Sequence, residues 1–160
     1  MHGQVKEFFE DFDVGDKFTS PYKTITDVEV NIFCILMGHA SLVDNTRNIH
    51  MNSEYAKSLG FKNRVVPGMQ TLPYISLLMG QVGLWKQVIL FLGLNNVRFT
   101  APVYPGDSIK VECEVINKKE VSKWPNTGII TYKVAVKNQD EKVVLEAEAS
   151  YQYRKRVMQS

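Results

Sequence analysis

Alternation of apolar and polar residues is the clearest pattern in the second half of the chain. Apolar and charged residues alternate from Ile109 to Val115, and a period of two also runs from Val143 to Tyr153. A third alternating stretch covers 130–137, and turn-forming residues separate the stretches at 125–128 and 138–140. Such alternation predicts strands with one buried and one solvated face. The second half is therefore expected to form an antiparallel sheet.

A fourth apolar stretch precedes these three strands. Residues 88–99 are nearly continuously apolar and rich in residue types that favour strands. A run of this kind is typical of a strand that is covered on both faces, so we expect a central strand of the sheet. Nearer the N-terminus, residues 18–26 alternate loosely and predict an opening strand.

Helix signals lie between the opening strand and the sheet. Thr26 is followed three residues later by Glu29, a pattern typical of a capped helix N-terminus. This helix is expected to run to about Met37 and to stop at Gly38, because a glycine commonly ends a helix. A second, short helix is expected over 53–60.

The stretch from Val65 to Trp85 contains no charged residue. Its length suits a membrane span, but prolines, glycines and glutamines interrupt it and leave it weakly apolar. A helix that is apolar on most sides is equally typical of one buried by a sheet. We favour a buried helix that begins at Gly68 and expect no association with a membrane. Its apolar stripe would consist of Leu72, Ile75, Met79 and Val82.

The order of these elements predicts the fold class. One strand, two helices, a buried helix and then four strands indicate an α+β fold, in which long antiparallel strands wrap around one apolar helix. The chain has 160 residues, of which 44% are hydrophobic, and this suits a single domain with a substantial core.

Charge and cysteine content exclude several classes of protein. The chain has 19 Lys and Arg against 17 Asp and Glu, a net charge of +2, with both signs scattered. A dedicated nucleic-acid-binding protein would gather its basic residues on one face, so no nucleic-acid partner is expected. The two cysteines, Cys34 and Cys113, fall on apolar positions and predict inert core thiols in a reducing compartment. Acidic N-terminal residues are not typical of a signal peptide, and we therefore expect a cytoplasmic protein.

Four segments carry a resemblance to a known family. They are 9–16, 48–56, 64–69 and 98–107, which read FEDFDVGD, NIHMNSEYA, RVVPGM and RFTAPVYPGD. In this order they resemble the MaoC-like branch of the hotdog fold, which includes the R-specific enoyl-CoA hydratases and the 3-hydroxyacyl-thioester dehydratases. The resemblance covers about residues 8–154 of a single domain spanning 1–160. It implies a hotdog fold, with a long curved sheet around one central helix.

The resemblance also implies an activity and an assembly. Members add water to, or remove it from, the α,β double bond of an acyl-CoA or acyl-carrier-protein thioester, as lyases of fatty acid metabolism. They are homodimers with two acyl-thioester tunnels at the subunit interface. No metal or redox cofactor takes part.

Two residues match the catalytic positions of the family. Dehydration needs a base for the α-proton, an acid for the departing β-hydroxyl and a hydrogen-bond donor for the enolate oxygen. His50 matches the motif histidine. Gly68 matches the glycine that opens the central helix, where a backbone N–H supplies the donor and the helix dipole assists.

The carboxylate of the motif is where this sequence departs from the family. The family reads Asp-x-Asn-Pro-Ile/Leu-His, but here Asn45 stands five residues before the histidine and Asp44 stands six before it. Arg47 and Asn48 occupy the usual Asn and Pro positions. Because an extra loop residue costs little, we favour Asp44 as the catalytic carboxylate. Asn45 and Asn48 are further candidates for substrate binding.

Other interpretations of these residues stay open. In one interpretation the chain lacks the catalytic carboxylate altogether. In another, Gly38 and His39 align with the Gly-Asp of the family motif, and a longer insertion follows them. Asp44 and Asn45 can form a simple turn, as that pair commonly does. Four basic residues could meet the phosphates of CoA or phosphopantetheine, but solvated surface charge is the preferred interpretation of each: Lys62, Arg64, Arg98 and Lys110.

The leading hypothesis is an acyl-thioester hydratase or dehydratase that uses Asp44, His50 and the Gly68 N–H. Two alternatives follow from the altered motif. The first is a catalytically degenerate hotdog subunit that binds acyl thioesters or stabilises an active partner. The second is a hotdog thioesterase, in which a carboxylate activates water against the thioester carbonyl.

Overall fold

The computed structural model of the chain describes residues 6–38 and 45–156. His39 and Asp44, both named above as candidates, lie outside these ranges. Within these ranges, short 3-10 helices cover Phe9–Asp11 and Asn45–Arg47.

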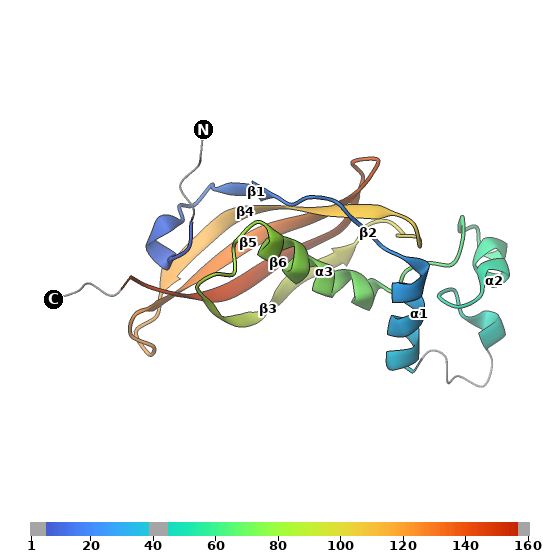
Figure 1. Ribbon diagram of the computed structural model, residues 1–160, viewed down its shortest axis with the longest axis horizontal. Helices are drawn as coiled ribbons and strands as arrows, with labels where there is room; N and C mark the ends of the chain where they lie inside the picture. The colour runs from blue at the N-terminus through green and yellow to red at the C-terminus, as the bar shows by residue number, and fades with distance from the viewer. Residues whose placement is uncertain (1–5, 39–44, 157–160) are drawn as a thin grey trace.

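One antiparallel sheet of six strands makes up most of the structure, and its strand order is β1-β4-β5-β6-β3, with β2 also paired to β4. Figure 1 shows the helix α3 lying across one face of this sheet, while α1 and α2 lie beyond one end of it. The helices are α1 (Asp27–Leu36), α2 (Ser53–Ser58) and α3 (Gly68–Gln81). The strands are β1 (Lys17–Thr19), β2 (Lys23–Thr24), β3 (Val88–Phe99), β4 (Ser108–Glu120), β5 (Thr127–Asn138) and β6 (Val143–Arg154).

The helix ends confirm the local signals in the sequence. The Thr26 side chain accepts a hydrogen bond from the Glu29 N–H, and the Glu29 carboxylate accepts one from the Thr26 N–H at 2.8 Å. This reciprocal cap fixes the start of α1 because it satisfies two donors that a helix N-terminus leaves open. The helix ends at Leu36, and Gly38 has the positive φ expected of a residue that follows a helix.

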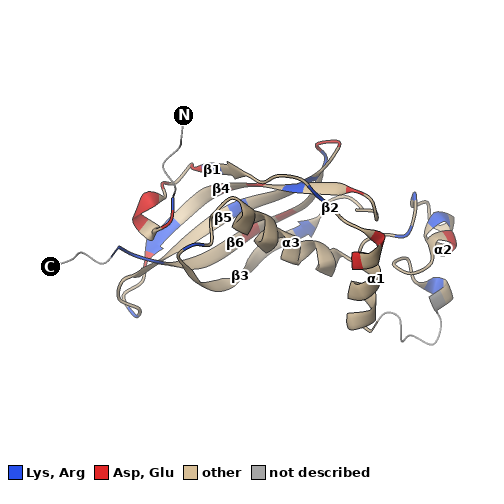
Figure 2. Cartoon of the chain, viewed as in Figure 1, with Lys and Arg blue, Asp and Glu red and all other residues tan. Residues whose placement is uncertain are grey.

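One side of the α3 helix packs against the sheet, while Met69 and Leu77 on the other side are 59% and 43% exposed. The helix carries no charged residue (Figure 2). Its Ile75, Leu78 and Met79 side chains belong to the main core, together with the sheet residues Tyr132 and Tyr151. Among the described residues no helix is long and apolar enough to cross a membrane. The chain thus has the α+β architecture expected from the element order, with the uncharged helix as its centre.

Alternating burial along the strands confirms the period of two in the sequence. In β4, residues 109, 111, 113 and 115 are buried while their neighbours are partly exposed. Both cysteines lie in the core, with exposed fractions of 0% for Cys34 and 5% for Cys113. Burial raises the pKa of the Cys113 thiol to about 12, so this thiol stays protonated and unreactive.

The expectation of a central strand at 88–99 is wrong, because β3 lies at the edge of the sheet, where β6 is its one partner among residues 6–38 and 45–156. Its apolar side chains remain accessible, with exposed fractions of 46% for Leu90, 52% for Phe91 and 46% for Leu92. A continuous apolar run indicates that both faces of a strand are shielded from water. It does not show that the shielding side chains belong to the same chain.

The single opening strand expected at 18–26 is two short strands. The chain leaves β1 before Pro21 and pairs again only at β2, since proline has no N–H to donate to the ladder. Between the two strands, Ser20 stays attached to β4, because its N–H donates to the Val111 carbonyl at 2.9 Å.

Candidate functional site

A pocket of about 560 Å³ lies beside the N-terminus of α3. Three polar side chains, those of His50, Thr71 and Thr100, are set in a wall that is otherwise apolar or backbone. The full lining is His50, Phe61, Val65, Val66, Gly68, Met69, Thr71, Phe99, Thr100, Ala101, Pro102, Val103 and Val144. The pocket is thus suited to an apolar ligand with a small number of polar atoms.

Two hydrogen bonds, one at the ring and one at the backbone, orient the imidazole of His50. Its Nδ1 lies 2.7 Å from the Val65 carbonyl oxygen, and its backbone N–H donates to the Asn48 Oδ1 at 2.8 Å. A carbonyl can only accept, so the bond to Val65 assigns the proton to Nδ1. In the neutral ring Nε2 is then the basic nitrogen, which is the form that a general base needs.

A buried arginine ties the His50 loop to the first helix. Arg64 is 8% exposed, and its guanidinium donates to the Asn31 side chain at 2.7 Å and to the His50 carbonyl at 3.2 Å. It also pairs with the Asp27 carboxylate at 2.6 Å. Arg64 is therefore a positioning residue. Neither solvated surface charge nor phosphate binding describes it, because its guanidinium is already enclosed.

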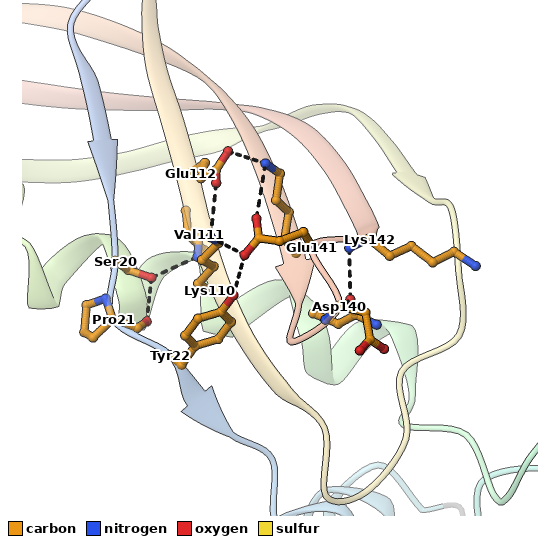
Figure 3. Close-up of polar contacts among 11 residues, drawn as sticks. Ser20, Pro21, Tyr22, Lys110, Val111, Glu112, Asp140, Glu141 and Lys142 are labelled. Carbon is orange, nitrogen blue, oxygen red and sulfur yellow. Dashed lines mark hydrogen bonds and ion pairs between the residues drawn. The ribbon is translucent and has the colours of Figure 1, made fainter.

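Lys110 is likewise engaged within the fold. Its ammonium lies 2.6 Å from a Glu141 oxygen and 3.4 Å from Glu112, and Tyr22 donates to the same Glu141 carboxylate (Figure 3). This cluster joins β4 to the turn before β6, away from the pocket lining. Lys62 and Arg98 are exposed, in keeping with the interpretation of solvated surface charge.

Gly68 is the first residue of α3, and its packing explains why it carries no side chain. A Cβ atom at this position would lie 3.0 Å from the ring of Phe99, which is closer than ordinary contact. The Gly68 N–H has no acceptor within the described parts of the chain, as expected in the first turn of a helix. An open donor at the positive end of a helix dipole, in a pocket wall, can stabilise a developing oxyanion.

Thr71 is a pocket residue that the sequence interpretation missed. It lies one turn after Gly68, is 2% exposed and lines the pocket, so its hydroxyl is placed to contact a ligand there. A helical threonine usually bonds back to its own backbone, so sequence alone gives no reason to single it out. The available signal was a polar residue three positions after the glycine, within a largely apolar helix.

The other predicted site residues lie outside the pocket or outside the description. Asn48 serves the turn that orients His50 and is not in the lining. Asn45 begins a 3-10 helix, and Asp44 is not described. Among the described residues of the lining, His50 is the only ionisable side chain. Over the same described ranges, no group of three or more His, Cys, Asp or Glu could hold a metal ion.

Comparison with solved structures identifies the fold. The chain superimposes with a TM-score of 0.70 on a Mycobacterium tuberculosis protein with a double hotdog fold, at 19% identity, covering 96% of this chain and 46% of that one. A monoamine oxidase regulatory protein from Archaeoglobus fulgius gives a TM-score of 0.80 at 30% identity, covering 96% of this chain and 99% of that chain. The α3 helix and its sheet thus form a hotdog fold.

Comparison of sequences identifies the family. A model described as a MaoC like domain matches residues 14–138, and the chain belongs to this family. It is 27% identical over 146 residues to the (R)-specific enoyl-CoA hydratase of Rhodospirillum rubrum, an alignment that covers 91% of each chain. It spans only 30% of the length of protein MaoC of Klebsiella aerogenes and 38% of the beta-methylmalyl-CoA dehydratase of Chloroflexus aurantiacus.

Proposed function

We propose that the chain is an acyl-thioester hydro-lyase, which adds water to a 2-enoyl thioester or removes it from a 3-hydroxyacyl thioester. The observation that supports this most strongly is that His50 and Gly68 line the same apolar pocket. His50 supplies a basic ring nitrogen and Gly68 an open backbone N–H. The alignment with an (R)-specific enoyl-CoA hydratase over 91% of both chains supports the same reaction class.

In the proposed hydration, His50 takes a proton from water as the water oxygen attacks Cβ. The electron pair of the double bond moves toward the thioester, and the Gly68 N–H donates a hydrogen bond to the resulting enolate oxygen. The second acid of the reaction then delivers a proton to Cα and regains one, by way of solvent, from the protonated His50, so the elements of water are added and no electrons are lost or gained overall. The reaction therefore needs no redox cofactor.

The second acid or base of this reaction is assigned to Asp44. The described lining contains no carboxylate, so this role stays a prediction. The same observation favours one alternative, a degenerate subunit that binds acyl thioesters without converting them. A thioesterase has less support, since it also needs a carboxylate and no observation of the pocket favours hydrolysis.

We further propose that two copies pair along β3. The strand is an unpaired edge with apolar side chains that are about half exposed, a combination that soluble proteins avoid unless a partner covers it. Phe99, at the end of β3, also lines the pocket, so a second copy on this edge would lie next to the site. Replacing the exposed Leu92 with Glu should shift the protein toward monomer in analytical ultracentrifugation, and an unchanged dimer would contradict this assembly.

The reduced, buried Cys34 and Cys113 support a cytoplasmic location for this enzyme. The test of its reaction is an assay with two substrates. Loss of the enoyl-thioester absorbance of crotonyl-CoA, without release of CoA, supports a hydratase. Release of CoA from saturated butyryl-CoA would instead support a thioesterase, and binding of both without conversion would support the degenerate subunit.

A further inference from the structure

The His50 pocket has a rim and a floor that differ in burial. Met69 and Phe99 line the pocket and are more than half exposed, so they mark its opening to solvent. Three valines of the same lining, Val66, Val103 and Val144, are at most 4% exposed. Buried residues that line an open pocket form its deep end, and we call these three residues the valine floor.

The main core closes the valine floor from behind. All three valines belong to the core cluster that also contains Ile75 and Leu145. Side chains in a protein core interdigitate at nearly crystalline density and leave few gaps larger than a water molecule. A ligand that reaches the floor therefore meets packed side chains and not a continuing tunnel.

Hydrogen bonds hold the floor in place. The Val66 N–H donates to the Val103 carbonyl at 2.8 Å. The Thr100 N–H donates to the Val144 carbonyl at 3.0 Å, and the Thr100 hydroxyl donates to the Val143 carbonyl at 2.7 Å. Because valine is also stiff at χ1, neither the backbone nor the side chains of the floor move aside readily. The pocket therefore has a fixed depth.

The α3 helix provides a measure of that depth. Gly68 and Thr71 both line the pocket, whereas Ile75, one turn beyond Thr71, is buried in the core. At a rise of about 1.5 Å per residue, Gly68 and Thr71 are about 4.5 Å apart along the helix axis. An extended chain advances about 1.2 Å per bond, as the polypeptide backbone does, so this depth takes about four bonds.

We propose that the valine floor restricts the substrate to short acyl groups of about four to six carbons, with Val144 as a specificity-determining residue. The inference rests on the proposed function for the position of the thioester at Gly68, from which the CoA or carrier portion leaves the pocket past Met69 and Phe99. The carbons of a short acyl group then fill the space between the Gly68 N–H and the floor. A longer chain would press against the valines, and overpacking of a rigid core is unfavourable.

Hydration rates of 2-enoyl-CoA substrates of increasing length test this limit. We expect kcat/KM of the wild type to fall by about 10- to 100-fold from 2-hexenoyl-CoA to 2-octenoyl-CoA. Val144→Ala shortens a side chain of the floor without changing a loop, and it should raise the ratio of 2-octenoyl-CoA to crotonyl-CoA hydration by about tenfold. Val134→Ala makes the same change at a buried position of β5 outside the pocket lining and should keep the wild-type ratio.

Binding of saturated thioesters, which cannot be hydrated, measures the same limit without turnover. In isothermal titration calorimetry, octanoyl-CoA should bind the wild type no more tightly than butyryl-CoA. Val144→Ala should shift this ratio toward octanoyl-CoA by about fourfold, the effect of burying one further methylene group. Val103→Ala opens the floor from the loop after β3 and provides a second variant if Val144→Ala does not fold.

Two results would overturn the proposal. The first is a wild-type affinity that rises from butyryl-CoA to octanoyl-CoA, or no binding of either. The second is a length profile of the floor variants that matches that of Val134→Ala. A length limit in binding without hydration of any enoyl thioester would refute the proposed function alone. Hydration of 2-octenoyl-CoA as fast as that of crotonyl-CoA would refute the floor alone.

Discussion

The ring of Phe99 lies 3.0 Å from the position that a Cβ atom on Gly68 would occupy. The contact brings the end of β3 next to the start of α3 in the pocket wall. A substitution at Gly68 therefore tests two separate roles of the glycine, its packing against Phe99 and its backbone N–H in the pocket. Because Phe99 is 51% exposed, its ring can move aside, so the clash with a methyl group is partly relieved.

Gly68→Ala should therefore reduce activity much more than stability. Alanine favours a helix by up to about 1 kcal/mol over glycine, which offsets part of an overpacking cost of about 1–3 kcal/mol. The added methyl group nevertheless stands at the N–H that we assign to the oxyanion, and kcat/KM should fall by about 100-fold. Enoyl-CoA kinetics and urea denaturation measure the two effects. Equal activity in the variant would remove the N–H from the mechanism.

The hydroxyl of Thr71, a residue of the pocket lining, predicts a smaller, specific effect on the same reaction. Thr71→Val keeps the shape of the side chain and removes one hydrogen bond to the ligand, worth about 0.5–1.5 kcal/mol, so kcat/KM should fall about two- to tenfold. Thr71→Ser retains the hydroxyl and should stay close to the wild type. A valine variant with wild-type kinetics would show that the hydroxyl contacts no reacting group.

Arg64 predicts a combined loss of stability and of His50 orientation. Arg64→Leu removes the hydrogen bonds to the Asn31 side chain and the His50 carbonyl, together with the Asp27 ion pair. The Asp27 side chain is 66% exposed, so solvent screens that pair and most of the cost comes from the buried hydrogen bonds, about 1–3 kcal/mol. Chemical denaturation measures this loss. A variant as stable as the wild type, with normal activity, would contradict the positioning role.

Glu29 predicts a defined acid dependence of stability. Despite burial, which opposes the shift, the hydrogen bonds from Lys23 and from Thr26 lower its pKa from 4.5 to about 2. A carboxyl group whose pKa is depressed in the folded state stabilises the fold fully above its unfolded pKa. That contribution is lost as the pH falls through the folded value.

Glu29→Gln keeps a side chain suited to the helix cap but removes the charge next to Lys23. The difference in melting temperature between the wild type and this variant should be constant from pH 7 to about 5 and should shrink between about 4.5 and 2. Thermal melts in a series of buffers measure it. A difference that is independent of pH would show that Lys23 and Thr26 do not stabilise the ionised carboxylate.

The sequence predicted those features that depend on neighbouring residues. The Thr26–Glu29 cap, the uncharged α3 and the alternating strands each follow from local hydrogen bonding or from one buried face, and the structure confirms them. The position of β3 depends instead on which strands pair across the fold. An apolar run cannot specify whether the strand is shielded by residues of the same chain or by a partner.

The candidate site was predictable only where a family motif marks it. His50 and Gly68 were found in this way, and both line the pocket. Thr71 was not found, because a polar residue in an apolar helix acquires meaning only when its surroundings in three dimensions are known. Arg64 was interpreted as a surface charge for the same reason, since only burial and partners show that a basic residue is structural.

Hydration of crotonyl-CoA by the wild type and by His50→Ala, measured side by side, tests the central claim most directly. The account predicts loss of the enoyl-thioester absorbance with the wild type and a rate lower by about 100- to 10,000-fold in the variant, with both proteins folded. Equal rates in the two proteins would contradict the assignment of His50. If neither crotonyl-CoA nor a panel of longer enoyl-CoAs is converted by the wild type, the hydro-lyase proposal is wrong and the binding subunit takes its place.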